Sequence, residues 1–180
     1  MRRCLILILC LVLIVLGSLN DSSVKKEVEV EVEAKTVIGV EYFEELDKYE
    51  KDVEMIAKVV YREARGLPLE HQAAVVWTIL NRVDAKDRFG NTIEEVITSP
   101  NQYAWNPDTP LTTEQLWIAR DVVEKWKMEK VNNNEEGRIL PKDYYFFSTG
   151  DDNTNWFRKE YESTEIWNWK MKNPYQNFEE

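Results

Sequence analysis

The chain has 180 residues, enough for one domain with flanking segments and too few for two large domains. Its formal net charge of −10 argues against a polyanionic nucleic-acid partner. Both cysteines, Cys4 and Cys10, lie in the first ten residues, so the remainder of the chain can form neither a disulfide nor a thiolate site.

Residues 1–18 have the pattern of a secretory signal. Two arginines precede a 13-residue apolar run from Cys4 to Leu16, and two small residues follow it. A membrane-spanning helix needs roughly 17 to 25 residues, so we predict a cleaved signal in preference to an uncleaved anchor. The protein is then secreted or held in the cell envelope, with membrane contact only through this N-terminal segment.

The next segment, 19–39, is acidic and lacks aromatic residues. It contains the repeat EVEVEVEA, whose strict alternation could be a strand. No turn and partner run follow it directly, so we predict a solvated acidic spacer. The folded domain is expected over 40–175.

The domain should be mainly helical with a little β structure, an α+β fold. Its first helix is expected over Glu41–Arg65, which contains neither Gly nor Pro, and its second from Pro68 to about Val83. The other predicted elements, two of them opened by capping boxes, are a short helix from Thr92 that ends before Pro100, a helix from Thr112 to about Lys130, a strand over 144–149, a turn over 150–153 and irregular chain to Tyr175.

Glu63 occupies an unusual position on the first predicted helix. It falls inside the apolar arc, flanked by Ile56 and Val60, whereas the other nearby charged residues form a solvated stripe. Burial penalises the ionised form of a carboxyl group, which keeps an acid protonated for donation to a glycosidic oxygen. The alternative is a structural ion pair with Arg62, Arg65 or Arg82.

Gln72 is a polar residue on the apolar face of the second predicted helix. It shares that face with Val76, Ile79 and Val83. A buried amide needs hydrogen-bond partners. We therefore expect Gln72 either to hold the Glu63 carboxyl or a sugar N-acetyl group, or to satisfy loop backbone.

The side-chain inventory leaves few kinds of catalytic site. His71 is the one histidine, whereas zinc sites usually use two or three. A serine triad would need that same histidine, and no nucleophile-elbow sequence supports it. No thiol nucleophile follows Cys10, and no glycine-rich phosphate loop is present. We therefore predict no metal, no cofactor, and carboxylate chemistry of the kind that cuts glycosidic bonds.

Aromatic residues in or beside predicted loops favour a sugar partner, because flat rings stack on sugar faces; the alternative is ordinary packing. Tyr103 and Trp105, in the loop after Pro100, are the best placed of them. The full set of these aromatic residues is Tyr103, Trp105, Tyr144, Tyr145, Trp156, Trp167 and Trp169.

Several sequence runs together resemble the SleB-type cell-wall hydrolases, the family of the spore cortex-lytic enzymes. The runs are Val60–Gly66 with its EARG element, His71–Val76, Ile79–Val83, Asn91–Ile97 and Gln102–Tyr103. They recur in order at the right separations, and the resemblance covers roughly residues 52–165.

The resemblance implies a fold like that of the lytic transglycosylases of the lysozyme superfamily, with Glu63 as the catalytic acid and base. The implied substrate is the glycan strand of peptidoglycan, cut between N-acetylmuramic acid and N-acetylglucosamine by a single glutamate. If the reaction is instead hydrolytic, Glu70 and Asp108 are candidates for a second carboxylate.

The predicted substrate-binding residues include four that match recurrent polar positions of the family, as cleft or scaffold residues, and two aromatic ones. They are Gln72, Asn81, Gln102, Tyr103, Trp105 and Tyr145. The alternative from another class is a non-catalytic peptidoglycan-binding envelope protein. We expect a monomer in either case.

Overall fold

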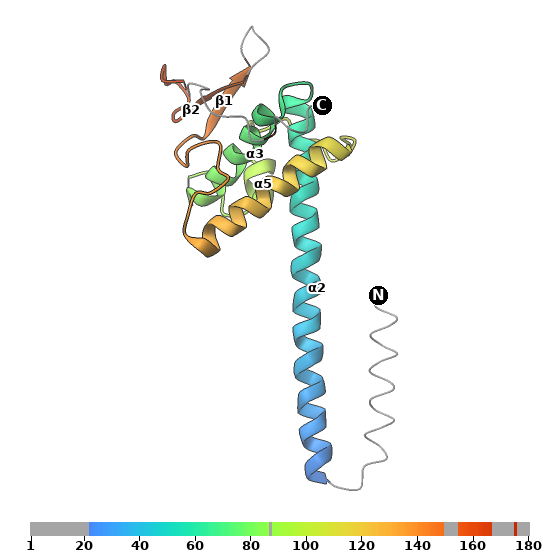
Figure 1. Ribbon diagram of the computed structural model, residues 1–180. Coiled ribbons are helices and arrows are strands. Elements are labelled where there is room, and N and C mark those ends of the chain that lie inside the picture. The colour runs from blue at the N-terminus through green and yellow to red at the C-terminus, as the bar shows by residue number, and fades with distance from the viewer. Residues whose placement is uncertain (1–21, 87, 150–154, 167–174, 176–180) are drawn as a thin grey trace. The chain divides into compact units, whose positions relative to one another are not determined.

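The computed structural model describes residues 22–86, 88–149, 155–166 and 175. Helices predominate and a small antiparallel sheet follows them (Figure 1), which confirms the α+β class. The elements are α2 (Ser22–Ala64), α3 (Leu69–Asp84), α4 (Ile93–Thr98), α5 (Thr113–Asn132), β1 (Phe146–Thr149) and β2 (Asn155–Arg158). The chain divides into two compact units, Met1–Lys48 and Tyr49–Glu180, and the predicted site residues lie in the second.

The segment predicted as a spacer is helical from Ser22 onward, as the first part of α2. Its EVEVEVEA repeat therefore does not form a strand. A lone strand has no partner for its backbone groups, whereas a helix pairs its own, and Glu, Lys and Ala are good helix formers. No helix in the described part of the chain is long and apolar enough to cross a membrane, and the predicted signal over 1–18 lies outside the described residues.

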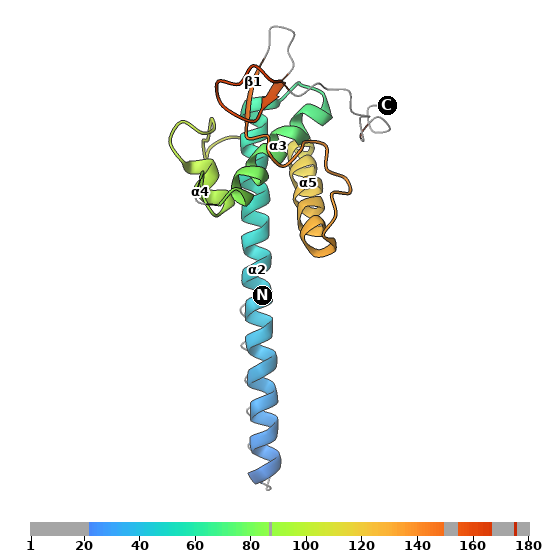
Figure 2. The ribbon, with the colours of Figure 1, turned by 90° about the vertical axis from the view of Figure 1, so that its left-hand side faces the viewer.

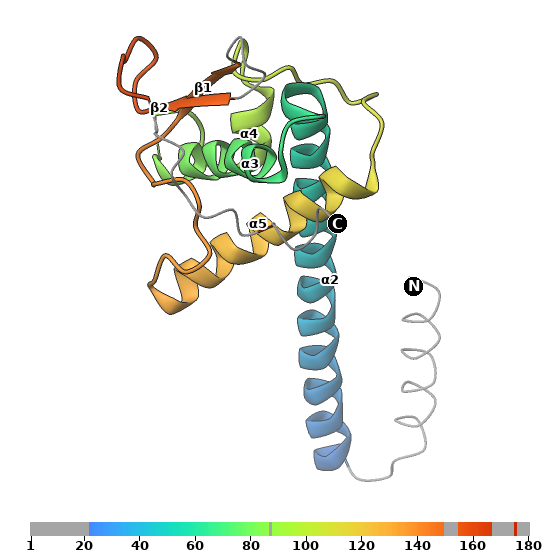
Figure 3. The same cartoon turned by 45° about the horizontal axis from the view of Figure 1, so that its top comes forward.

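Helix α3 is the centre of the second unit. Every residue from His71 to Val83 is buried, which confirms the predicted central helix. Figure 2 shows α4 and α5 on opposite sides of α3, and in Figure 3 the β hairpin lies against it. Fully burying one Leu, Ile or Val side chain stabilises the fold by roughly 1.5 to 3 kcal/mol. Many such side chains hold α3 in one position, and this also fixes the polar residues that the helix carries.

The segment Asn155–Arg158 was expected to be irregular but forms a strand, β2. Strand β2 pairs antiparallel with β1, with Phe147 opposite Phe157 and Thr149 opposite Asn155. Its burial alternates, since Asn155 and Phe157 are buried and Trp156 is exposed. Four residues are too few for this periodicity to stand out in a sequence. The predicted turn over 150–153 lies outside the described residues.

Both predicted N-caps are confirmed, although in neither does the third helical residue accept from the N-cap backbone N–H as a full capping box requires. Thr92 is the N-cap of α4, and its Oγ1 accepts a hydrogen bond from the Glu95 backbone N–H at 3.1 Å. The Glu95 carboxylate in turn accepts from the Asn91 backbone N–H at 2.7 Å. Thr112 is the N-cap of α5, where its hydroxyl oxygen accepts from the Gln115 N–H and its hydroxyl donates to the Gln115 side chain. The caps satisfy backbone donors that the first turn of each helix leaves open.

Replacing Thr92 with alanine should lower the free energy of unfolding by about 1 kcal/mol, because the first turn of α4 loses its side-chain acceptor. Urea denaturation of the two proteins measures the change. Thr98→Ala is the matched control, since the Thr98 hydroxyl donates to the Glu94 carbonyl at the other end of the same helix. Equal decreases in unfolding free energy in the two variants would show that the N-cap hydrogen bond does not contribute to stability.

Candidate active site

Glu63 lies in the last turn of α2, where the helix ends at Ala64. Gly66 then adopts φ +84°, a left-handed conformation that favours glycine, and the chain turns toward α3. The Glu63 side chain is half-buried while Arg62 and Arg65 are exposed, as the helical periodicity predicts. Within the described residues no ion pair joins Glu63 to an arginine.

The loop after α4 supplies the partner of this carboxylate. The backbone N–H of Ala104 donates to Glu63 Oε1 at 2.6 Å. The Trp105 N–H donates to the Tyr103 carbonyl at 2.8 Å, which closes a tight turn centred on Ala104. The turn therefore determines where the Ala104 N–H points.

Tyr103, a predicted site residue in this loop, is held by α3. The buried Thr78 hydroxyl donates to the Val75 carbonyl at 2.7 Å. That bond uses the single hydroxyl hydrogen of Thr78, so the Tyr103 phenol is the donor in its 3.4 Å contact with Thr78. Burial raises the pKa of Tyr103 above its ordinary value, although the charge of Arg82 acts in the opposite direction. Tyr103 is therefore a neutral hydrogen-bond donor at physiological pH.

Arg82, which the sequence suggested only as an ion-pair partner of Glu63, lies among the predicted site residues. Its guanidinium is buried and donates from Nε to the Tyr145 carbonyl and from an Nη to Gln102 Oε1, both at 2.8 Å. It lies 4.7 Å from the centre of the Tyr103 ring. Arg82 thus contacts three of the predicted site residues. Its place in the family-like run Leu80–Val83 is the sequence feature that could have pointed to it.

Gln72 is 1% exposed and its amide is fully engaged. It donates to the Leu67 carbonyl at 3.0 Å and to Glu114 at 2.8 Å, and it accepts from Gln115 at 2.8 Å. Of the alternatives weighed from the sequence, these contacts favour the support of loop backbone. Substrate binding by Gln72 remains a prediction.

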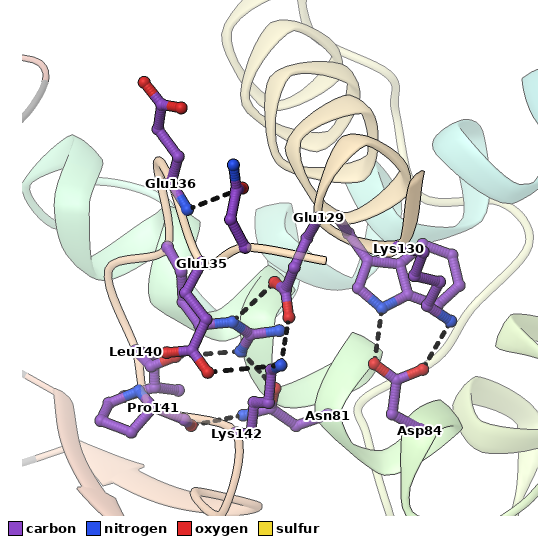
Figure 4. Close-up of polar contacts among 12 residues, drawn as sticks. Asn81, Asp84, Glu129, Lys130, Glu135, Glu136, Leu140, Pro141 and Lys142 are labelled. Carbon is purple, nitrogen blue, oxygen red and sulfur yellow. Dashed lines mark hydrogen bonds and ion pairs between the residues drawn. The ribbon is translucent and has the colours of Figure 1, made fainter. Parts of the chain in front are cut away.

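Asn81 is likewise buried and engaged. Its amide donates to the Pro141 and Tyr144 carbonyls at 2.8 and 2.9 Å, and its oxygen accepts from Arg138 at 2.7 Å. Figure 4 shows Asn81 beside Pro141, below the ion pairs of Glu129. These contacts tie the segment before β1 to α3, which favours the scaffold role over direct substrate contact.

The two aromatic candidates are half-buried. Trp105 packs against the hydrophobic core, and the Tyr145 ring lies 5.3 Å from Phe89 and 4.9 Å from the Arg88 guanidinium. Each contributes to packing and keeps part of its surface open to solvent. Their role in sugar binding remains a prediction.

A cavity of about 430 Å³ lies along α5, and Glu63 is not among the residues that line it. Its charged side chains are already paired, Arg120 with Glu50 and Asp121 with Lys125, each at 2.7 Å. The lining residues are Thr113, Leu116, Trp117, Arg120, Asp121 and Glu124. None of them is a predicted site residue, so the candidate chemistry stays with Glu63 and the loop that orients it.

The chain matches the family described as Cell Wall Hydrolase over residues 66–170. It is similar to a spore cortex-lytic enzyme of Oceanobacillus iheyensis, 32% identical over 99 residues that cover 54% of this chain and 33% of that protein. A spore cortex-lytic enzyme of Bacillus cereus is 31% identical over 99 residues, 54% of this chain and 35% of that protein. The chain thus spans about a third of the length of these curated relatives. No solved structure matches it.

The family match begins at Gly66, three residues after Glu63. It includes α3 with Thr78 and Arg82, and the loop with Tyr103, and it extends over more than half of the chain. The resemblance seen in the sequence is therefore confirmed: the chain belongs to the cell wall hydrolase family.

Proposed function

We propose that this protein cuts peptidoglycan glycan strands between N-acetylmuramic acid and N-acetylglucosamine, with Glu63 as the single catalytic acid and base. The observation that carries the proposal is a half-buried carboxylate fixed by one backbone donor, Ala104 N–H. Membership of the cell wall hydrolase family and the names of the relatives support it. A lysozyme-like fold, export by residues 1–18, a spacer over 19–39 and a monomeric state belong to the same proposal.

The Ala104 hydrogen bond assigns different roles to the two oxygens of Glu63. The Ala104 N–H donates to Oε1, so we assign the proton transfer of the reaction to the other oxygen, Oε2. Oε2 donates its proton to the glycosidic oxygen as the bond to C1 of muramic acid breaks. The leaving N-acetylglucosamine keeps that proton as a hydroxyl group.

The carboxylate formed in this step then acts as the base. It takes the proton of the muramic acid C6 hydroxyl while that oxygen bonds to C1, which closes a 1,6-anhydro ring and restores the neutral Glu63. The cycle consumes no water and needs no second carboxylate. Hydrolysis would need a second carboxylate. The candidate Asp108 is exposed and lies in a turn, where its backbone N–H donates to Asn106 Oδ1.

Mass spectrometry of the products of purified peptidoglycan tests the reaction type. We expect 1,6-anhydromuramyl ends after digestion with the full chain. Reducing muramyl ends in their place would establish hydrolysis and direct the search for a second carboxylate to Glu70 and Asp108.

The alternative function is glycan binding without catalysis, and the half-exposed rings of Trp105 and Tyr145 are what favours it. Zymography separates the two functions, because clearing of a peptidoglycan gel requires bond cleavage. Retention on wall material with no clearing and no new ends would favour the binding protein.

A further inference from the structure

We propose that Arg82 is a positioning residue for Glu63: through Gln102 and Tyr103 it fixes the turn whose Ala104 N–H orients the carboxylate. This inference rests on the proposed function of Glu63. It adds a residue from α3 that touches neither the carboxylate nor, in this account, the reacting atoms.

The surroundings of Arg82 are unusual for a buried cation. The side chain is 4% exposed, and its hydrogen-bond acceptors are the neutral Tyr145 carbonyl and the Gln102 amide oxygen. The rings of Phe89 and Phe146, with Tyr103, lie 4.7 to 5.2 Å from the guanidinium carbon. No carboxylate of the described residues pairs with it.

Such burial is costly, because a charge leaves water without gaining an opposite charge. Burial accordingly lowers the pKa of the Arg82 guanidinium below its ordinary value, against the opposing influence of Tyr103 and Glu63. Replacing Arg82 with an apolar side chain would remove this cost but would leave the Tyr145 carbonyl and Gln102 Oε1 without their donor. The geometry of the guanidinium, rather than stability, is therefore what Arg82 provides.

That geometry joins two segments far apart in the sequence. One nitrogen bonds to Tyr145, just before β1, and another to Gln102 in the loop after α4. One helical turn earlier, Thr78 accepts from the Tyr103 phenol. Helix α3 thus holds both residues that precede Ala104.

The contacts continue from this loop to the carboxylate. Tyr103 accepts the Trp105 N–H that closes the turn, and the Ala104 N–H at the centre of the turn donates to Glu63. A shift of Gln102 and Tyr103 would move that N–H and with it the Glu63 carboxyl. Displacement of a catalytic group by about 1 Å can lower a rate by about 10²-fold.

Lysine at position 82 would retain the charge and remove the planar fork that serves two acceptors at once. We expect Arg82→Lys in the full chain to lower kcat on solubilised glycan strands by about 10- to 100-fold, with KM changed by less than about 2-fold. Arg120→Lys is the matched control, because Arg120 forms an exposed ion pair with Glu50. Near-UV circular dichroism and the thermal midpoint verify folding.

Gln102→Ala provides a second variant if Arg82→Lys fails to fold, and it should also lower kcat rather than raise KM. If the two residues act through one turn, the double variant loses no more activity than the more affected single variant. Additive losses, a raised KM at unchanged kcat, or a loss equal to the unfolded fraction would each overturn the proposal.

Glu63→Gln in the same assay separates this inference from the proposed function. An inactive Glu63→Gln beside an Arg82→Lys as active as Arg120→Lys refutes only the role of Arg82. A fully active Glu63→Gln refutes the proposed function itself.

Discussion

Glu63→Gln lowers the rate of glycan cleavage by about 10²- to 10⁴-fold, the usual contribution of a general acid and base. The glutamine oxygen can still accept the Ala104 N–H that Oε1 accepts in the wild type. Its amide group takes the place of Oε2 and has no acidic proton for the glycosidic oxygen. The variant therefore keeps the geometry of the site and loses its chemistry, which initial rates on purified peptidoglycan measure.

Glu54→Gln is the matched control, because Glu54 lies exposed on the same helix, among the charged residues of the solvated stripe. It should cleave at the wild-type rate and unfold at the wild-type temperature. A similar loss of activity in both variants would mean that the helix, rather than a catalytic carboxyl, is what the substitutions disturb.

Removing Glu129 should destabilise the domain by about 3 to 5 kcal/mol, the cost of leaving a buried partner charge uncompensated. Glu129 on α5 pairs with the buried Arg138 at 2.8 Å and with Lys142 at 2.7 Å (Figure 4). Arg138 also donates to Asn81 on α3 and lies 4.1 Å above the Trp77 ring. Glu129→Ala therefore loosens the attachment of α5 to the central helix, which urea denaturation at pH 7 measures.

Glu135→Ala is the matched control for this network. Glu135 is exposed and contacts the exposed Lys142 at 3.3 Å, and exposed pairs contribute about 0 to 1 kcal/mol. Comparable decreases in unfolding free energy in the two variants would show that the buried ion pairs of Glu129 stabilise the domain no more than an exposed pair does.

The effect of Glu129 also depends on pH. Burial alone would raise the pKa of Glu129, but the hydrogen bonds from Lys142 and Arg138 outweigh it and lower the pKa below the ordinary 4.5. A lowered pKa in the folded state contributes stability above the ordinary value and loses it as the pH falls through the lowered one. The difference in unfolding free energy between wild type and Glu129→Gln should therefore shrink as the pH falls below about 4.5.

Helical periodicity and capping chemistry allowed much of this structure to be predicted from the sequence. The inward position of Glu63 and the buried circumference of α3 follow from residues within a few turns of each other. The same holds for the caps at Thr92 and Thr112, whose partners lie three residues away. Each of these features depends on residues close together in the chain, so it can be recognised from the sequence alone.

The features that were missed depend on contacts between distant segments. Strand β2 exists because β1 pairs with it, and Arg82 acquires its role from Gln102 and Tyr145, 20 and 63 residues away in the chain. Gln72 could not be assigned before its partners on α5 were known. The EVEVEVEA run was predicted to belong to a solvated spacer, with a strand as the alternative, and it lies instead in a helix that spans 22–64.

The most direct test of the account is to digest one batch of purified peptidoglycan with wild type and with Glu63→Gln, at equal folded concentration, and to count newly formed glycan-strand ends. The account predicts new muramyl ends from the wild type and almost none from the variant. Ends released at equal rates by both proteins would contradict a catalytic role for Glu63, and with it the site built around Ala104.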